Sequence, residues 1–557
     1  YAESILASLF FGSNFFFYFS TTEYGADSAL LKPFLHTWSL GVEEQFYLVF
    51  PILAIIAFKY FRKHFLTILV GLSLLSILFS ELMEVRNADL NFYLPFSRFW
   101  ELAVGSMLAY RELYYKPSNE GFASKSLPMI GLYLIAYSIL FFDGKTPHPS
   151  FHTLIPIIGV ALIIGFASKD ELVGKVLGSK PFVWVGLISY SAYLWHFPIF
   201  AFSRMGKEPT NYDKFEWIVL TIVLSVITYF SVEKFFRNRK IIKRTYFIVL
   251  IATALIFSVI GALKVLSNDG YVDRLPPILR SDLTEKPWMF NRTLEGEYCY
   301  GWYGKTDFCR FGNKNGKRSI YVIGDSNMES ISSALISLFD LNSYRITTMN
   351  SSACYFIPNS FSGINGRPRF IPNEPCDEKF QQLRLSELGK TSNNILVVGG
   401  MLDVYLKQDG LGFETSNDKS VQQNFVSNII NLVSKGNKVV LVYPYPRARE
   451  NIGKRAFSAL TASNLPSLKK QITEMRKGTS YKTSEFMSYS KEAFDLLDKI
   501  ESDNIVRVYP HHLFCDDQKC EFLSDDALFV VDQNHPSSYF AAKFSELIRK
   551  ELDLKGW

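Results

Sequence analysis

The strongest constraint on the fold of this chain is the uneven distribution of its hydrophobic residues. Long apolar runs such as "FLTILVGLSLLSILFS" and "WIVLTIVLSVITYF" recur through residues 1–266, whereas residues from about 267 onward have the composition of an ordinary soluble domain. Runs of this length are typical of helices that cross a lipid bilayer. With 557 residues, the chain is also too long for one compact core. We therefore expect a multi-span α-helical membrane domain followed by a soluble domain.

Nine segments of the first half are candidate membrane spans, several of them near the lower length limit. They are residues 3–19, 38–58, 64–83, 95–110, 127–142, 151–167, 182–203, 215–233 and 245–265. The sequence starts at Tyr1, inside an apolar run and with no recognisable signal peptide before it. We therefore expect further spans upstream of this residue.

The basic residues between the predicted spans indicate an orientation in the membrane. Alternate loops, around residues 59–63, 111–125, 169–180 and 234–244, hold fifteen lysines and arginines, and the other loops hold six. Because cytoplasmic loops are enriched in Lys and Arg, the first set is expected in the cytoplasm and the soluble domain outside it. The net charge of +6 is thus largely a topology signal, and basic residues spread over loops do not indicate nucleic-acid binding.

All cysteines of the chain lie in the soluble half. They are Cys299, Cys309, Cys354, Cys376, Cys515 and Cys520. An even number of cysteines on one side of a membrane favours disulfides over reduced thiols. Six cysteines allow fifteen pairings, and pairing of sequence neighbours is the simplest of them. The Cys and His spacing of a zinc site is absent from the sequence, so no metal is expected.

Ionisable and polar side chains occur inside several predicted spans, where they are costly unless they face a cavity or a partner. Ser39, Glu43 and Tyr47 follow one another at helical spacing on one face of the predicted helix 38–58. A polar cavity within the membrane is one interpretation, and a helix end in interfacial water is the other. A proton-coupled transporter would also explain such residues. The candidates for a membrane site are His36, Ser39, Glu43, Glu44, Tyr47, Arg98, Glu101 and His196.

Three stretches of the membrane half resemble the integral membrane acyltransferase 3 family. They are "HTWSLGVEEQFYLVFP" (36–51), "FSRFWELAVGSMLAY" (96–110) and "SYSAYLWHFPIF" (189–200). The resemblance covers residues 1–240, and residues 241–266 would be an additional transmembrane helix. It implies transfer of acyl groups, often acetyl from cytosolic acetyl-CoA, to sugars outside the membrane. The characteristic histidine and arginine motifs of the family lie in its first spans, which we expect upstream of Tyr1.

Two motifs of the soluble half indicate nucleophilic catalysis. In "KRSIYVIGDSNMESISSALISLF" a strand, a Gly-Asp-Ser turn and a helix are expected in succession, which would present the Ser326 hydroxyl at the end of a sheet. Near the C-terminus, "FVVDQNHPSS" supplies Asp532 and His535 three residues apart. A serine nucleophile needs a general base, and that base needs an orienting carboxylate. The alternative is that the serine turn and the histidine only cap their neighbouring elements.

Residues 317–557 resemble the SGNH hydrolase fold through Gly324-Asp325-Ser326 and Asp532-x-x-His535. The resemblance implies an α/β three-layer domain with a mostly parallel sheet, preceded by a linker at 267–316. Other blocks depart from the family pattern, since Leu402 stands where the family has an oxyanion-stabilising Asn. The oxyanion candidates are therefore Ser326, Ser352 and Gly400. The loop "HLFCDDQKC" is similar to SGNH domains that are fused to membrane acyltransferases.

The combined resemblance is to bacterial O-antigen acetyltransferases. It implies transfer of an acyl group, expected to be acetyl from acetyl-CoA, to hydroxyls of an extracytoplasmic glycan such as lipopolysaccharide O-antigen. The expected partners are the lipid bilayer, a glycan acceptor and an acyl-CoA donor, with no bound cofactor. The expected location is the bacterial inner membrane with the C-terminal domain in the periplasm. Peptidoglycan or another polysaccharide as acceptor, a tethered esterase and a transporter with an accessory domain are the alternatives.

Overall fold

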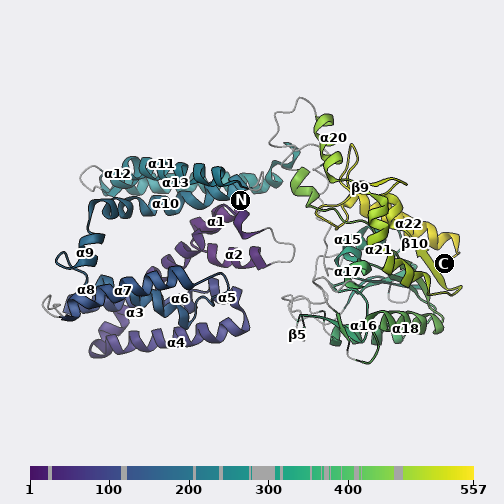
Figure 1. Cartoon of the computed structure of the whole chain (residues 1–557), viewed down its shortest axis with the longest axis horizontal. Coiled ribbons are helices and arrows are strands. Elements are labelled where there is room, and N and C mark those ends of the chain that lie inside the picture. Colours follow the sequence, from purple (N-terminus) through teal and green to yellow (C-terminus); the bar gives the residue numbers. More distant parts are fainter. Residues whose placement is uncertain are drawn as a thin grey trace. The chain divides into compact units, whose positions relative to one another are not determined.

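The computed structural model of the chain consists of two compact units, Tyr1–Gly270 and Tyr271–Trp557 (Figure 1). It describes residues 1–557 except 23–27, 115–121, 205–208, 238–241, 275–277, 279–307, 314–317, 352–353, 365–366, 369–375, 377, 391, 407–412, 416 and 457–467. The expected subdivision into residues 1–240, 241–266, 267–316 and 317–557 is finer than these two units. Most of the expected linker lies outside the described residues.

Helices and the loops that join them make up the described residues of the first unit. Its longer helices are α3 (Thr37–Phe61), α4 (Phe65–Arg86), α6 (Pro95–Tyr114), α7 (Phe122–Phe141), α8 (Leu154–Phe166), α10 (Lys180–Arg204), α11 (Asn211–Thr228) and α13 (Arg244–Ser267). Its shorter helices are α1 (Ala2–Leu9), α2 (Ser13–Thr22), α5 (Ala88–Tyr93), α9 (Leu172–Leu177) and α12 (Lys234–Arg237). Within the unit, α7 packs on α8, α4 on α6 and α10 on α11.

Four apolar helical stretches among the described residues are long enough to cross a membrane: Thr37–Arg86, Lys180–Arg204, Asn211–Arg237 and Arg244–Ser267. Two shorter apolar helices cover Ser126–Phe141 and Phe151–Phe166. Large apolar side chains on these helices are exposed, as for Phe257 on α13 at 79%. Such exposure is expected of helices that contact lipid rather than water.

The first predicted span, residues 3–19, is wrong as a single helix. The structure has α1 and α2 in its place, and the chain between them turns at Phe11, whose φ is +56°. A residue with positive φ cannot continue a right-handed helix, so the hydrogen-bond ladder stops there. The apolar composition of the segment gave no sign of this break.

Helices α7 and α8 approach each other closely at two glycines. A Cβ atom added to Gly131 would lie 2.6 Å from the backbone oxygen of Gly159, and one added to Gly159 would lie 2.8 Å from that of Gly131. Small residues at such a crossing allow the helix backbones to touch, which replaces the hydrophobic effect as the source of packing energy within a bilayer.

The second unit is built on a six-stranded sheet of order β1-β3-β2-β6-β8-β10. These strands are β1 (Cys309–Gly312), β2 (Arg318–Ile323), β3 (Tyr344–Thr348), β6 (Ile395–Val398), β8 (Lys438–Val442) and β10 (Ile505–Val508). The five strands from β3 to β10 pair in parallel, and β1 is antiparallel to β3. The central strands are buried on both faces, in agreement with the apolar runs "ILVV" and "VVLV".

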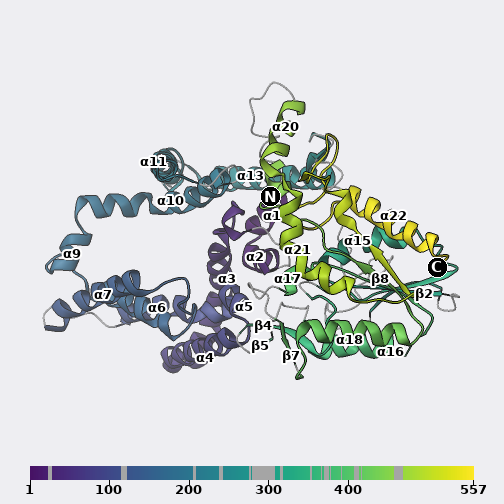
Figure 2. The same cartoon turned by 45° about the vertical axis from the view of Figure 1, so that its right-hand side comes forward.

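Helices cover both faces of this sheet, as Figure 2 shows within the second unit. Helices α16 (Glu378–Gly389) and α18 (Val421–Ser434) lie on one face. Helices α15 (Ser326–Ser337), α21 (Thr483–Asp498) and α22 (Ser538–Leu554) lie on the other, and α15 packs on α22. The short helix α17 (Leu402–Leu406) follows β6, and α20 (Leu468–Thr479) precedes α21.

The expectation of a mostly parallel sheet is confirmed only in part. Strand β1 makes the main sheet mixed, and two small antiparallel sheets stand beside it. One contains β4 (Ser360–Ile364), β5 (Arg367–Pro368) and β7 (Phe413–Thr415), and the other contains β9 (Tyr481–Lys482) and β11 (Lys519–Cys520). An antiparallel edge strand needs no crossover helix, so the strand–helix alternation in the sequence does not reveal it.

Candidate active site

Ser326 is the first residue of α15, directly after β2 and the Gly324-Asp325 turn. Asp325 caps this helix, because its Oδ1 atom accepts a hydrogen bond of 2.9 Å from the backbone N–H of Asn327. Its Oδ2 atom accepts a second one of 2.8 Å from the backbone N–H of Met401. The aspartate of the Gly-Asp-Ser turn therefore fixes the nucleophile turn and joins it to the segment after β6.

A continuous chain of hydrogen bonds runs from Ser326 to Asp532. The Nε2 atom of His535 lies 2.8 Å from Ser326 Oγ, and its Nδ1 atom lies 2.6 Å from Asp532 Oδ2. Because a carboxylate can only accept, Nδ1 carries the proton and Nε2 is left to accept the proton of the serine hydroxyl. The structure thus brings together the three residues that the sequence indicated, in the order nucleophile, base and orienting acid.

The Asp532 carboxylate is held in its ionised form. Burial by itself raises the pKa of Asp532, but the hydrogen bond and charge of His535 together with two backbone N–H groups outweigh it and hold the pKa below its usual value. Those N–H groups belong to Asn534 and His535, each 2.9 Å from Asp532 Oδ1. An ionised Asp532 is the form that can orient and stabilise an imidazolium on His535.

A second set of contacts ties the histidine turn to the nucleophile helix, and sequence reasoning missed it. The Tyr445 hydroxyl lies 2.8 Å from Asn327 Oδ1 and 3.0 Å from the backbone oxygen of Asn534. The side-chain amide of Asn534 also donates to Asn327 Oδ1 at 2.9 Å. Burial raises the pKa of Tyr445 well above its usual value, so its hydroxyl stays a donor. The only signal in the sequence was the position of both asparagines beside Ser326 and His535.

The structure supports the three oxyanion candidates to different degrees. The backbone N–H of Ser326 lies at the N-terminus of α15, where the helix dipole favours negative charge. Gly400 has a φ of +124°, and a Cβ there would lie 2.6 Å from Asp325 Oδ2, so both conformation and space require glycine. Leu402 is a buried apolar residue and cannot supply the side-chain donor found in the family. Ser352 lies outside the described residues.

The structure contains the disulfides Cys354–Cys376 and Cys515–Cys520, as predicted. Cys309 is also disulfide-bonded, and its predicted partner Cys299 lies outside the described residues. Among the described residues, no group of three or more His, Cys, Asp or Glu side chains could hold a metal ion.

Part of the predicted membrane site gathers where α3 begins, against α10. The rings of His36 and His196 have centroids 5.6 Å apart, and the Ser39 hydroxyl lies 2.6 Å from that of Tyr193. The Tyr193 hydroxyl also donates to the backbone oxygen of His36. Tyr193, which sequence reasoning missed, therefore links α10 to the start of α3.

The remaining membrane candidates lie on α3 and α6. Arg98 pairs with Glu101 at 3.3 Å, both largely buried, and its guanidinium lies 4.7 Å from the centroid of the Trp38 ring. Spacing of three residues on α6 would allow Arg98 to pair with Glu101, and Glu43 and Glu44 are the other carboxylates among the candidates; the structure shows the pair with Glu101. Glu101 and Tyr47 line a pocket of about 450 Å³, whereas Glu43 and Glu44 are half-buried on α3.

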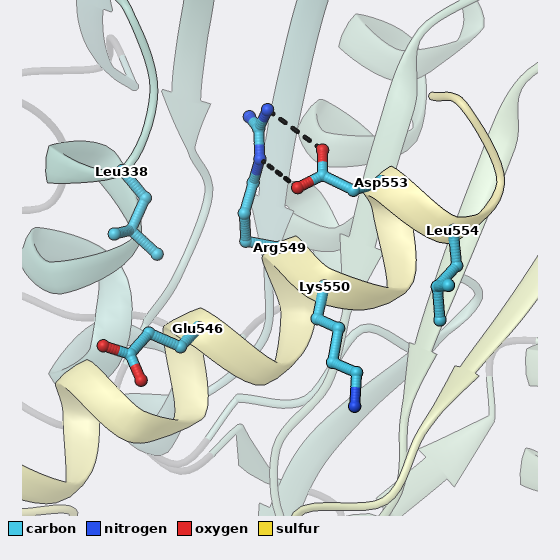
Figure 3. A pocket seen from close by; sticks show the side chains of 6 residues that line it. All are labelled: Leu338, Glu546, Arg549, Lys550, Asp553 and Leu554. Atoms are coloured by element: carbon cyan, nitrogen blue, oxygen red, sulfur yellow. Dashed lines mark hydrogen bonds and ion pairs between the residues drawn. The ribbon is translucent and has the colours of Figure 1, made fainter.

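A separate pocket of about 430 Å³ lies on the second unit, away from the serine (Figure 3). It is lined by the last turns of α22, including Arg549 and Asp553, which form an ion pair of 3.0 Å. His535 precedes the opposite end of this helix, and the rise per residue separates the two ends by roughly 20 Å. This pocket is therefore not part of the serine site.

Comparison with known families agrees with the division into two units. Residues 4–260 match the acyltransferase domain family, and residues 295–550 match the SGNH domain that is fused to such acyltransferase 3 domains. The two matches together span nearly the whole chain. The chain therefore belongs to the proteins that join an acyltransferase 3 domain to a C-terminal SGNH domain.

Two curated relatives match part of the chain. The peptidoglycan O-acetyltransferase OatA of Listeria monocytogenes is 30% identical over 217 residues, which are 37% of this chain and 35% of OatA. The putative peptidoglycan O-acetyltransferase YrhL of Bacillus subtilis is 25% identical over 250 residues, which are 42% of this chain and 39% of YrhL. The chain thus spans well under half the length of these relatives.

A solved structure, the periplasmic domain of a lipopolysaccharide acetyltransferase from Salmonella Paratyphi A, covers 43% of this chain and 85% of its own length. Its sequence identity is 17% and its TM-score is 0.30, which is too low to support a conclusion.

Proposed function

We propose that this protein is an O-acyltransferase that modifies hydroxyls of an extracytoplasmic glycan, with acetyl as the acyl group. The observation that carries the proposal is the hydrogen-bond chain Ser326–His535–Asp532 within an SGNH domain that is joined to an acyltransferase domain. The membrane unit would receive the acyl group from a cytosolic acyl-CoA donor and pass it to the SGNH unit. The basic residues of the loops support an SGNH unit outside the cytoplasm.

The chemistry of the SGNH unit follows from the geometry of the three residues. Ser326 Oγ attacks the carbonyl carbon of the incoming acyl group while His535 Nε2 takes the hydroxyl proton. The leaving group departs with that proton, and an ester on Ser326 remains. A sugar hydroxyl then attacks the ester, gives its proton to His535, and releases Ser326, which recovers the proton. The backbone N–H of Ser326 stabilises the oxyanion in both steps.

The proposal also concerns which glycan accepts the acyl group. The names of the relatives OatA and YrhL favour peptidoglycan, while the sequence resemblance favours lipopolysaccharide O-antigen in an inner-membrane enzyme with a periplasmic domain. Both are glycans outside the cytoplasm, so the reaction at Ser326 is the same for either. A tethered esterase would use the same three residues but would not need the membrane candidates such as Arg98.

The test compares O-acetylation of surface glycans in cells that express the wild-type gene or Ser326→Ala at equal protein level. Proton NMR of the purified polysaccharide and, separately, of digested peptidoglycan reports the acetyl groups on each acceptor. We expect one glycan to lose its acetyl groups in the variant. Wild-type acetylation of both glycans in Ser326→Ala cells would contradict the proposal.

A further inference from the structure

A second pocket of the SGNH unit lies at the same sheet edge as Ser326. It has a volume of about 310 Å³, and its lining includes Asp403, which follows β6, and Arg447, which follows β8. Ser326 follows β2, which is parallel to both strands. The carboxyl ends of parallel strands meet at one edge of a sheet, which is where ligands of such folds bind. Its volume is at the lower end of the range of ligand pockets, roughly 300–1,000 Å³.

The wall of this pocket is joined to the turn that carries the base. Gln533 lines the pocket and is the next residue after Asp532. The backbone N–H of Ala448, another lining residue, donates to the backbone oxygen of Gln533 at 2.7 Å. The backbone N–H of Ile452 donates to the backbone oxygen of Asp532 at 3.0 Å. A ligand in the pocket is therefore held against the same segment that positions His535.

Two tyrosines give the pocket aromatic surface, and each has an arginine over its ring. The Arg447 guanidinium lies 5.6 Å from the centroid of the Tyr489 ring and donates to its hydroxyl at 3.0 Å. The Arg449 guanidinium lies 5.6 Å from the centroid of the Tyr481 ring. Aromatic rings suit the apolar C–H face of a sugar, and the guanidinium and carboxylate groups suit its hydroxyls, which both donate and accept.

The charges of the lining balance. Arg447 and Arg449 stand against Asp403 and Glu485, and Arg449 makes two hydrogen bonds to Glu485, of 2.7 and 2.8 Å. Asp403 is 3% exposed and accepts a hydrogen bond of 2.7 Å from Ser490. Because the lining carries no net charge, it gives an anion no electrostatic advantage over a neutral ligand, and its donors and acceptors suit a neutral ligand rich in hydroxyls.

We propose that this pocket binds a neutral sugar residue of the acceptor glycan, next to the residue whose hydroxyl receives the acyl group. The inference rests on the proposed function, which it deepens by naming the kind of sugar and the side chains that recognise it. Tyr489 and Tyr481 contact the faces of the ring, and Arg447, which has no carboxylate partner among the described residues, donates to its hydroxyls.

Binding can be measured without any acyl transfer. Saturation-transfer difference NMR on the purified full chain in detergent would use the methyl glycosides of glucose, galactose, rhamnose and N-acetylglucosamine as probes, with inorganic phosphate as an anionic competitor. We expect at least one glycoside to bind and phosphate not to displace it. Arg447→Ala and Tyr489→Ala should each weaken that binding about tenfold or more, because a charged donor or a ring face is lost. Arg447→Lys should recover only part of it, since the planar fork is missing.

The matched control is Arg549→Ala on α22, another arginine that lies over an aromatic ring, 4.9 Å from the centroid of Phe339, and that should bind the glycoside as the wild type does. Ser326→Ala should also bind it normally, so a failure of the proposed catalysis is distinguishable from a failure of this site. In membranes, Arg447→Ala should raise KM for the acceptor more than it lowers kcat. Binding of none of the glycosides, binding that is indifferent to Arg447 and Tyr489, or displacement by phosphate would overturn the proposal.

Discussion

His535 Nε2 lies 2.8 Å from Ser326 Oγ although 209 residues separate the two in the sequence. Ser326 comes directly after β2, whereas His535 lies in the turn before α22. Ser545 of α22 donates to the Ile331 oxygen of α15 at 3.4 Å, so the helices after the two residues are also joined.

Loss of the nucleophile and loss of the base should not be additive. In the triad of a well-studied serine protease, loss of the serine or of the histidine costs on the order of 10⁶-fold in kcat, and loss of both costs little more. We expect Ser326→Ala to abolish glycan acylation, and the addition of His535→Ala to change almost nothing. Asp532→Asn should be less severe, because it leaves both reacting groups in place. Acylation measured in cells at equal protein level checks this, and independent multiplicative losses would contradict it.

The ionised state of Asp532 predicts how stability depends on pH. Its folded pKa is lowered, so its contribution is fully present above the unfolded pKa of about 3.9 and is lost as pH falls through the folded value. The difference in Tm between wild type and Asp532→Asn should therefore be constant from pH 7 to about pH 4 and shrink below that. Thermal unfolding at a series of pH values measures it. A difference that begins to shrink near pH 6 would assign the effect to another group.

Tyr445→Phe should reduce activity by more than its effect on stability implies. The variant removes the hydroxyl that joins Asn327 to the Asn534 oxygen, so the histidine turn is free to shift relative to Ser326. We expect a loss of about tenfold in kcat, since a displacement of about 1 Å costs up to 10²-fold. Tyr443→Phe is the control, because Tyr443 donates to Asp498 at 2.6 Å and touches none of the three catalytic candidates. Both variants should lose about 1 kcal/mol of stability, and equal activity in the two would refute a positioning role.

Arg98 and Glu101 should behave as a buried pair. Their side chains are 7% and 15% exposed, so Arg98→Ala leaves an uncompensated carboxylate and should cost about 3–5 kcal/mol. Protein level in membranes should fall in that variant and recover when Glu101→Leu is combined with Arg98→Met. If the pair serves the reaction, glycan acylation will stay low in the double variant despite normal protein level. Arg237→Ala, which breaks the pair of Arg237 with Glu233 at a guanidinium that is 72% exposed, should change neither protein level nor acylation.

The orientation predicted from the loops can be tested directly. A reporter that is active only outside the cytoplasm should be active when fused after Asp269 and inactive when fused after Lys180. The reason is the excess of Lys and Arg in the loops around residues 59–63, 111–125, 169–180 and 234–244. The reverse pattern would place the SGNH unit in the cytoplasm and remove its access to surface glycans.

The catalytic candidates could be found from the sequence because each motif is local. Gly-Asp-Ser and Asp-x-x-His each fix their own turn, and the segment after β8 holds the histidine turn through Tyr445 and Ala448. Tyr445 could not be found in this way, since its partner Asn327 is 118 residues distant and the contact exists only in the folded sheet. The helix break at Phe11 was not predicted for a different reason. Hydropathy indicates whether a segment suits the lipid, but it does not report the backbone φ angle of a single residue.

Strand β1 illustrates what the sequence pattern leaves open at an edge. Cys309–Gly312 is only four residues long, which is too short for a periodicity that would predict the strand or its direction. The sequence pattern also leaves open which contacts the membrane candidates make. The motif around His36 was apparent in the sequence, but its contact with Tyr193 depends on how α10 packs against the start of α3.

The order of the catalytic candidates along the chain has a consequence for biosynthesis. At roughly 5–20 residues per second, the ribosome makes Ser326 about 10–40 s before His535. During that interval, and in any product truncated before Asp532, the serine lacks its proposed base and α15 lacks the helix that packs on it. The proposed acyl-ester site is therefore incomplete until the segment from Asp532 through α22 has been made, and a nascent domain without that segment should neither hydrolyse nor trap acyl groups.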